Sequence, residues 1–239
     1  MYYVGAGSKW DNNELRFSLR SVEKYCKNIG KIYIVGEKPD TIEVDGGYLE
    51  YPDGKVAYFN SVAKITAAVT AFESMTDDFW VMMDDVFFCD YVDLDELGYF
   101  IRSKHLKTKN TNHWGQNIKM TGMILRGLGL KDRNFEEHSP FLLNKEKWIQ
   151  MKEIFDFQTN LPWGLAWRSL YGNRYKINGT LQSDMKLRGS YIEEHGDIYE
   201  IMEDLLKDRY CFSIDDTCIN LGMNEWLEKQ FPNKSKWEK

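Results

Sequence analysis

An apolar run that leads directly into two adjacent aspartates is the feature that most limits how this chain can fold. Residues 79–90 read FWVMMDDVFFCD, so Asp84 and Asp85 stand between two segments of buried character. Adjacent carboxylates repel each other, and a pair at the end of a buried strand requires a cation or a protected network of hydrogen bonds. The alternative is structural, with one aspartate capping the next helix and the other facing solvent. The apolar flanks favour the first interpretation, because they would hold both carboxylates in a fixed and partly dry position.

A divalent cation is the partner that we expect for this pair. Mg²⁺ and Mn²⁺ prefer oxygen ligands, typically one or two carboxylates together with substrate phosphate oxygens and water. The sequence therefore predicts a metal-bound pyrophosphate, with Asp85 as the metal ligand and Asp84 on the side of the donor.

Strand and helix patterns alternate through the first 90 residues. Residues 2–4 form a short apolar strand that runs into GAGS, and residues 31–37 (KIYIVGE) form a second, buried strand. Between them, Asp11 and Glu14 stand three apart in the arrangement of a capping box, which predicts the start of a helix. The apolar stripe of this helix consists of Leu15, Leu19, Val22, Cys26 and Ile29. Strand, helix and strand in this order predict a parallel pair with a right-handed crossover.

A second helix and a third strand continue the alternation. Residues 58–75 carry an apolar helical face, with Asn60 or Ser61 placed to cap its start, and the strand FWVMM follows. In open parallel sheets, ligands bind beyond the carboxyl ends of the strands, so Gly5, Gly36 and the aspartate pair should lie together. We predict an α/β fold with a mostly parallel, Rossmann-like central sheet flanked by helices.

Size and composition point to one ordinary globular domain. The chain has 239 residues, 43% of them hydrophobic, which is enough for one substantial α/β core and too short for two enzyme domains of average size. Its four cysteines form no CxxC pair, which argues against a zinc site and favours reduced, buried thiols. No signal-peptide pattern and no apolar stretch of membrane-spanning length is present, so we expect a cytoplasmic protein.

Charge is unevenly distributed along the chain. The net charge is −6, yet residues 102–133 hold eight basic residues and one acid, a local charge of +7 that leaves −13 on the rest. Because this segment is weakly periodic and contains four glycines, we expect it to form a long, partly irregular excursion over the active-site face. Its positive charge suits a polyanionic acceptor such as a phosphorylated glycan, with DNA as the second choice. The alternative is that the segment is only a solvated surface, as basic segments commonly are.

Four segments together resemble the successive conserved regions of the Stealth-type sugar-phosphate transferases of capsule synthesis. They are DNNELRFSLRSVEKYCKNIGKIYIVGEKPD, YFNSVAKITAAVTAFESMTDDFWVMMDDVFF, HSPFLLNKEKW and CFSIDD, in that order. That group has a nucleotide-sugar-binding fold of the GT-A type. The chain is also similar to the wider set of GT-A glycosyltransferases, in which an acidic motif at a strand end binds the donor's metal. Two positions depart from the Stealth pattern, because the first strand reads YVGAGSKWD and Met83 replaces a polar residue.

The resemblance implies roles for residues outside the first aspartate pair. Arg16 would contact the pyrophosphate, and Asn60 belongs to a segment that suits an anion at a helix N-terminus. His138 matches a histidine of the resembling proteins and would be a third metal ligand or an acid/base group. Asp215 and Asp216 resemble a terminal motif that would complete the metal site or deprotonate the acceptor hydroxyl.

Each of these residues also has a simpler interpretation. Asn60 can merely cap its helix, the second aspartate pair can form an Asx-turn or an N-cap, and a lone histidine usually has no chemical role. On the donor side we further expect Val4, Gly5, Asp11 and Arg168. Arg168 comes from a segment rich in aromatic rings and arginines, which suits sugars and phosphates but also ordinary core packing.

We therefore predict a single GT-A-like catalytic domain over residues 1–239. Residues 1–90 would bind the nucleotide sugar, and residues 91–239 would bind the acceptor and complete the active site. The predicted reaction is metal-dependent transfer of a sugar, with Mn²⁺ or Mg²⁺, from a nucleotide-sugar donor to an acceptor hydroxyl. One rival is Stealth-like transfer of a sugar-1-phosphate, ranked second because of the short length and the altered first strand. The other is an inactive nucleotide-sugar-binding or nucleic-acid-binding protein, which Met83 favours and the two aspartate pairs oppose.

Overall fold

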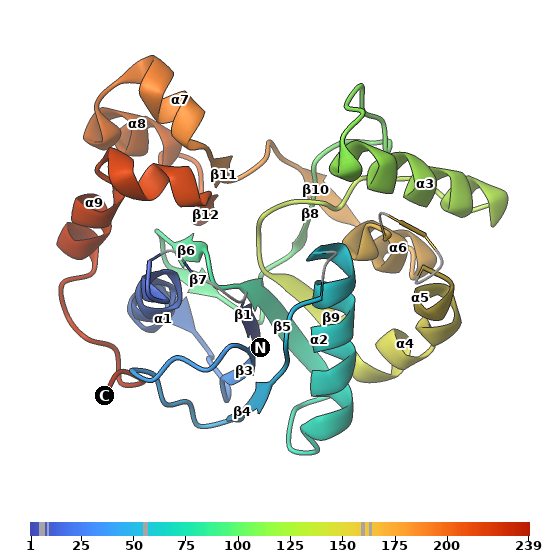
Figure 1. Ribbon diagram of the computed structural model, residues 1–239, viewed down its shortest axis with the longest axis horizontal. Coiled ribbons are helices and arrows are strands. Elements are labelled where there is room, and N and C mark those ends of the chain that lie inside the picture. The colour runs from blue at the N-terminus through green and yellow to red at the C-terminus, as the bar shows by residue number, and fades with distance from the viewer. Residues whose placement is uncertain (5–7, 9, 55–56, 159–160, 163) are drawn as a thin grey trace.

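The computed structural model describes residues 1–4, 8, 10–54, 57–158, 161–162 and 164–239, and it shows a mixed α/β fold (Figure 1). Gly5, one of the predicted donor-binding residues, lies outside the described residues. The central sheet has five strands in the order β4-β3-β1-β5-β9. Their bounds are β1 Tyr2–Val4, β3 Tyr33–Gly36, β4 Gly47–Glu50, β5 Asp78–Met83 and β9 Phe141–Asn144. Strands β4, β3, β1 and β5 pair in parallel, and β9 pairs antiparallel to β5.

The carboxyl ends of three parallel strands meet at one edge of this sheet. Val4 is the register partner of Gly36, and Tyr3 is the partner of Met83. Asp84 and Asp85 follow Met83 directly, in a two-residue turn that leads to β6 (Val86–Phe88). The prediction that Gly36 and the aspartate pair lie at the same edge is therefore confirmed.

The first helix, α1 (Asn13–Tyr25), buries Leu15, Leu19 and Val22 of the predicted apolar stripe, but it ends before Cys26 and Ile29, and its predicted capping box does not form. The cap residue is Asn12, in a left-handed conformation with φ 56° and without a side-chain cap bond. Glu14 instead accepts a hydrogen bond from the hydroxyl of Ser8 at 2.9 Å. Since Ser8 also accepts from the Asn12 amide, a side chain outside the helix takes over the role of the box.

Two buried serines of α1 fix the strand that follows the aspartate pair. The hydroxyl of Ser18 donates to the carbonyl of Val86, and the hydroxyl of Ser21 accepts from the amide of Phe88 at 2.9 Å. Both serines are fully buried, so each hydroxyl satisfies a backbone group of β6 that would otherwise lack a partner. The turn that carries Asp84 and Asp85 is thus held from both sides.

A second, smaller sheet brings the C-terminal part of the chain to the same turn. It has the order β11-β12-β6, where β11 is Lys186–Leu187 and β12 is Cys211–Ile214. Strand β12 runs antiparallel to β6 and parallel to β11. Residues more than 100 positions after Asp85 therefore lie beside it.

The second helix begins earlier than the sequence predicts. Helix α2 spans Ala57–Ala71, so Asn60 lies inside its first turn, and the prediction that Asn60 or Ser61 caps the helix is wrong. The Asn60 side chain instead holds the preceding loop, with Oδ1 accepting from the Gly54 amide at 2.8 Å and Nδ2 donating to the Gly54 carbonyl at 3.2 Å. The Asn60 side chain therefore fixes the loop before the helix and does not cap the first backbone amides of the helix.

The basic segment from 102 to 133 is less irregular than predicted, because it contains helix α3 (His113–Gly127). Asn112 caps this helix by accepting from the Gly115 amide at 2.9 Å. The glycines that suggested a loop allow close packing instead, since a Cβ at Gly115 would lie 2.2 Å from the carbonyl oxygen of Asn110. The buried face of α3 includes Ile118 and Leu125.

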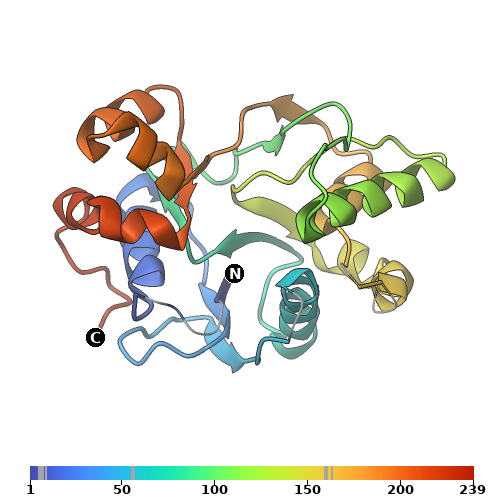
Figure 2. The same cartoon turned by 45° about the horizontal axis from the view of Figure 1, so that its top comes forward.

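The remaining helices fall into two groups. The first comprises α4 (Lys145–Ile149), α5 (Lys152–Gln158) and α6 (Trp167–Arg174). The second comprises α7 (Gly189–His195), α8 (Ile198–Leu205), a 3-10 turn η1 (Asp216–Leu221) and α9 (Met223–Gln230). The two groups lie on opposite sides of the molecule, with α3 beside the first (Figures 1 and 2). Among the described residues, no helix has the length and apolar character needed to cross a bilayer.

Two short strand pairs complete the fold. Strand β2 (Cys26–Lys27) pairs with β7 (Val92–Asp93), and β8 (Tyr99–Ile101) pairs with β10 (Gly179–Leu181), both in parallel. The pairing of β8 with β10 anchors the start of the basic segment beside the chain that leads to β11.

Gly172 allows α6 to pack against the segment that precedes β9. A Cβ at this position would lie 2.7 Å from ring atoms of Phe135, which is fully buried. We expect Gly172→Ala to lower the free energy of unfolding by about 1–3 kcal/mol, because the overpacking outweighs the helix propensity that alanine gains. Denaturant unfolding measures this. The control is Gly127→Ala, where a Cβ meets nothing within 4 Å, and wild-type stability in Gly172→Ala would contradict the prediction.

Candidate active site

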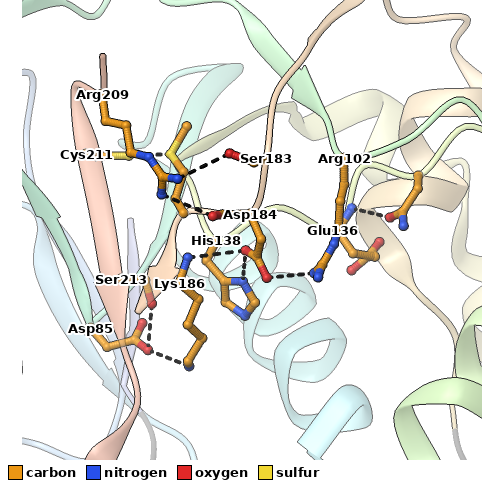
Figure 3. A network of polar contacts seen from close by, with 12 residues as sticks. Asp85, Arg102, Glu136, His138, Ser183, Asp184, Lys186, Arg209, Cys211 and Ser213 are labelled. Atoms are coloured by element: carbon orange, nitrogen blue, oxygen red, sulfur yellow. Dashed lines mark hydrogen bonds and ion pairs between the residues drawn. The ribbon is translucent and has the colours of Figure 1, made fainter. Parts of the chain in front are cut away.

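Asp85 is the centre of a polar network at the carboxyl end of β5 (Figure 3). Its Oδ2 atom accepts a hydrogen bond from the hydroxyl of Ser213 at 3.0 Å and an ion-pair contact from the ammonium of Lys186 at 3.2 Å. Its Oδ1 atom is buried and has no hydrogen-bond partner among the described residues. Since a buried carboxylate oxygen without a partner is costly, this atom is ready to bind a cation or a donor group.

The register of the small sheet places these three side chains together. Ser213 on β12 is the partner of Val86 on β6 and of Lys186 on β11. The amide of Ile214 donates to the carbonyl of Asp85 at 3.4 Å, which holds the aspartate against the sheet. Three separate strands thus converge on one carboxylate.

A second acidic centre, Asp184, lies next to the first. It accepts from Nδ1 of His138 at 2.8 Å and from the guanidinium of Arg102 at 2.7 Å, and the Lys186 amide donates to it at 3.3 Å (Figure 3). Burial alone would raise the pKa of Asp184, but the hydrogen bond from His138 and the charges of His138 and Arg102 lower it to about 2. Asp184 is therefore ionised at neutral pH.

The ionised state of Asp184 fixes the tautomer of the histidine. A carboxylate without a proton can only accept, so Nδ1 of His138 must carry the hydrogen. In the neutral imidazole the basic nitrogen is then Nε2, on the opposite side of the ring. A carboxylate that orients a histidine in this way is a common arrangement for proton transfer, and 26% of the His138 side chain is exposed.

Two buried ionisable side chains, one acidic and one basic, lie close to this centre. Glu137 is 1% exposed and Arg168 is 6% exposed. Both carboxylate oxygens of Glu137, and Nε and Nη2 of Arg168, lack a hydrogen-bond partner within the described part of the chain. Burial and the charge of Asp184 raise the pKa of Glu137 to about 8, against smaller opposing effects of the charges of Arg102 and Arg168. Glu137 is consequently protonated at neutral pH.

The second aspartate pair divides its roles. Asp215 is the N-cap of η1 and accepts from the amides of Thr217 at 3.1 Å and Gly189 at 3.3 Å. Asp216 is exposed, and its charge, like that of Asp85, contributes to a raised pKa of Glu14, for which burial is the largest cause. Glu14, Asp85 and Asp216 therefore lie near one another, with Asp216 on the open side.

The other predicted residues have contacts of their own. Val4 ends β1 beside Gly36, and the charge of Asp84 contributes to the raised pKa of buried Tyr2. Asp11 is exposed in the turn before α1, with φ 55°. The Nε atom of Arg16 lies 3.9 Å from a carboxylate oxygen of Glu238. Among the described contacts, none joins Arg16 or Asn60 to the aspartate pair.

A divalent cation fits this site through few protein ligands. No group of three or more His, Cys, Asp or Glu side chains in the described parts of the chain is arranged to hold a metal. Mg²⁺, however, is usually bound by one or two carboxylates and substrate phosphates rather than by an all-protein cage. The Oδ1 atom of Asp85 supplies one such carboxylate, and Asp216, which is exposed and acts with Asp85 on Glu14 by its charge, is a candidate for a second. His138 pairs with Asp184 instead.

Several residues of the network escaped sequence analysis. Lys186, Ser213 and Asp184 belong to short strands or loops without a recognisable motif, and Glu137 stands in no pattern that indicates a function. The signal that would reveal them is long-range pairing, because Lys186 and Ser213 are 101 and 128 residues from Asp85. A single sequence does not contain that information.

A pocket of about 830 Å³ lies at the opposite end of the central sheet. Its lining includes Tyr2, Ile32, Tyr33 and Phe79, at the amino ends of the parallel strands. Ligands of open parallel sheets bind beyond the carboxyl ends, and the lining of this pocket includes neither Asp85 nor Asp184 nor any of their side-chain partners. We therefore place the candidate site at Asp85.

Comparisons with known proteins return no match for this chain, either among protein-family models or among curated proteins. The resemblance to Stealth-type and GT-A enzymes thus stays a prediction.

The raised pKa of Glu137 predicts how stability depends on pH. The folded protein keeps the Glu137 proton up to about pH 8, whereas an unfolded glutamate loses it near its ordinary value of 4.5. Between these values the folded state binds more protons, so the free energy of unfolding should fall as pH rises, by about 1 kcal/mol per pH unit. Denaturant unfolding at pH 5, 6, 7 and 8 measures this slope.

The control for this measurement is Glu137→Gln, which keeps the shape and removes the titration. We expect its stability to decline less steeply over the same pH range. Equal slopes in the two proteins would show that Glu137 is already ionised in the folded state.

Proposed function

We propose that the protein is a metal-dependent glycosyltransferase of the GT-A type, which moves a sugar from a nucleotide-sugar donor to an acceptor hydroxyl. The observation that carries the proposal is Asp85, whose buried Oδ1 atom lacks a partner among the described residues at the carboxyl end of β5. Parallel pairing of β3, β1 and β5 supports a Rossmann-like donor site at this edge. The division into a donor part and an acceptor part is included in the proposal.

The chemistry that we propose breaks the bond between the anomeric carbon and the phosphate oxygen. The electron pair of that bond stays with the departing nucleoside diphosphate, and the acceptor oxygen forms the new bond to the anomeric carbon. When bound at Asp85, a Mg²⁺ or Mn²⁺ ion supplies positive charge that stabilises the departing diphosphate. Asp84 and the end of β1 at Val4 would line the donor, with Arg16 nearby.

The proton of the acceptor hydroxyl needs a base, and two groups fit. Asp216 is exposed near Asp85 and Glu14, and His138 has Nε2 available because Asp184 fixes the hydrogen on Nδ1. Arg168 presents the Nε and Nη2 side of its guanidinium without a partner in the described structure, and this fork suits a phosphate or a pair of sugar hydroxyls. We assign Arg168 to the donor on this basis.

Transfer of a sugar-1-phosphate is the second candidate reaction. The His138–Asp184 pair suits this reaction as well as the first, because an oriented histidine would also deprotonate a hydroxyl that attacks phosphorus. In that case a nucleoside monophosphate leaves. A binding-only protein is the third possibility, and any metal-dependent turnover would exclude it.

The three candidates differ in the product that each releases. We expect the purified protein, with Mn²⁺ and a panel of nucleotide sugars, to release a nucleoside diphosphate by slow transfer to water, detected by chromatography. Asp85→Asn should lower the rate at least 100-fold, because the diphosphate loses its charge partner. Asp90→Asn, at an exposed aspartate five residues further on, is the matched control and should keep wild-type activity.

The outcomes separate the proposals. Release of a nucleoside monophosphate together with a sugar phosphate would establish phosphotransfer instead. Full activity in Asp85→Asn would contradict the assignment of Asp85 to the metal.

The acceptor that we propose is polyanionic, because a ribbon of unpaired lysines leads to the site. We use the name basic ribbon for residues 102–109 and 131–134, which pair through backbone hydrogen bonds: Arg102 with Asn134 at 2.8 Å and Leu106 with Asp132 at 2.6 Å. One end of this ribbon holds Arg102, which contacts Asp184.

The acidic residue of the basic ribbon does not neutralise its lysines. Asp132 is occupied by His105 at 2.8 Å and by Arg126 at 2.6 Å. The lysines are exposed and make no ion pair with another described residue; they are Lys104, Lys107, Lys109 and Lys131. Such a surface suits phosphate groups, and a phosphorylated glycan offers acceptor hydroxyls along its length. DNA is the less favoured acceptor.

Removing three of these lysines should weaken binding of a phosphate polymer in a salt-dependent way. For the triple alanine variant at 104, 107 and 109, we expect the affinity for fluorescent poly(ribitol phosphate) to fall about tenfold or more at low salt. The slope of log K against log salt should become shallower by about 2, because each lost phosphate contact removes about 0.7. Fluorescence anisotropy across a salt series measures both quantities.

The matched control removes three exposed lysines at the other end of the sheet, namely Lys24, Lys27 and Lys31. It changes the net charge equally and should bind almost as the wild type does. Equal losses in the two triple variants would mean that only net charge matters. Tighter binding of a single-stranded oligonucleotide with the same number of phosphates would favour nucleic acid as the acceptor.

The four cysteines are free. Free, mostly buried thiols support the cytoplasmic location, which is part of the same proposal.

A further inference from the structure

Lys186 occupies the position where a positive charge is needed at Asp85. Its ammonium lies 3.2 Å from Oδ2, and the two side chains are 18% and 20% exposed. An ion pair so largely buried is strong while both partners are present and costly once one is removed. Lys186 is therefore the counter-ion of Asp85 in the free protein.

A divalent cation and Lys186 compete for this carboxylate. Glu14 and Asp216 lie near Asp85, so several acidic groups surround the carboxylate that the ammonium of Lys186 contacts. A divalent ion on the free Oδ1 atom would stand within a few ångströms of the ammonium. Two positive charges at that separation repel strongly in a partly buried site, which would drive Lys186 away from Asp85.

The structure holds the backbone of Lys186 while leaving its ammonium able to move. The Lys186 amide donates to Asp184 at 3.3 Å, and β11 pairs with β12, so the Cα atom is anchored. The ammonium contacts a single carboxylate oxygen and stands on a flexible four-carbon stem. An arginine would grip the carboxylate with two parallel bonds and would be harder to displace.

We propose that Lys186 is an exchangeable counter-ion, which neutralises Asp85 in the free protein and moves to the diphosphate of the donor when a divalent cation takes its place. The second half rests on the proposed function, because it assumes a nucleotide-sugar donor. As the bond to the anomeric carbon breaks, its electron pair passes to the diphosphate oxygen. Lys186 then stabilises the added negative charge, and the acceptor proton passes to Asp216 or His138.

The first test measures Mn²⁺ binding to the free protein by electron paramagnetic resonance, without nucleotide. Lys186→Gln removes the competing charge, so we expect the Kd for Mn²⁺ to fall about tenfold. Lys186→Arg keeps the ion pair and tightens it, so its Kd should rise. Lys207→Gln, at an exposed lysine that pairs with Asp204, is the control and should match the wild type. An unchanged Kd in both Lys186 variants would overturn the exchange.

The second test measures nucleotide affinity in the presence of Mn²⁺, with ADP, CDP, GDP, UDP and the matching monophosphates as probes. We expect Lys186→Gln to lose at least tenfold in affinity for the diphosphate that the wild type binds, and less than threefold for the monophosphate. Equal losses for both nucleotides, or no loss, would show that Lys186 does not reach the second phosphate.

Failure of the proposed function gives a different result. If the wild type binds none of the diphosphates, the donor assignment is wrong, and so is the move of Lys186 to the diphosphate. The Mn²⁺ titration still decides whether Lys186 competes with the cation for Asp85. Thermal unfolding monitors the fold of each variant. Lys186→Gln leaves Asp85 largely buried without a cation, which can prevent folding. In that case the double variant Asp85→Asn/Lys186→Gln should recover the melting temperature. The Kd of Lys186→Arg for Mn²⁺ then decides the first test.

Discussion

The pairing of β12 with β6 is the constraint on which the rest of the site depends. It places Ser213 opposite Val86 and, through β11, puts Lys186 in the same row, so Asp85 receives both of its partners from one register. A shift of this register by one residue would turn Ser213 and Lys186 to the other face of the sheet. The two buried serines of α1 oppose such a shift by holding the backbone of β6 at Val86 and Phe88.

Charge is balanced locally, and each acidic centre has its own cations. Asp85 pairs with Lys186, Asp184 pairs with His138 and Arg102, and Asp132 pairs with His105 and Arg126. Glu137 is the exception, because it has no cation partner among the described residues and avoids a buried charge by remaining protonated. The exposed lysines of the basic ribbon are the opposite exception, because they make no ion pair with another described residue.

Local patterns made some of these features predictable and left others out of reach. The helical stripe at Leu15, Leu19 and Val22 and the strand before Asp84 follow from periodicity and apolar runs, and both were correctly located. Helix α3 was missed because Gly115 and Gly122 suggested a loop, whereas they serve close packing. The start of α2 was misplaced because the side chain of Asn60 does not cap the helix. Its Oδ1 atom accepts from the Gly54 amide in the loop before the helix. In the site, Asp85 was identifiable from its neighbours, but Lys186, Ser213 and Asp184 act across distances in sequence that no local pattern spans.

The wide separation of these partners also sets the order in which the protein can become competent during folding. Asp85 leaves the ribosome about 100 residues before Lys186 and about 130 before Ser213, so β5 and the acidic turn exist for some time without the strands that neutralise them. Closing loops of this length carries an entropic cost that local contacts do not repay, and such pairings form late. The sheet that completes the candidate site is thus among the last parts to dock, and a partly folded chain has the acidic turn at Asp84 and Asp85 without Lys186 and Ser213.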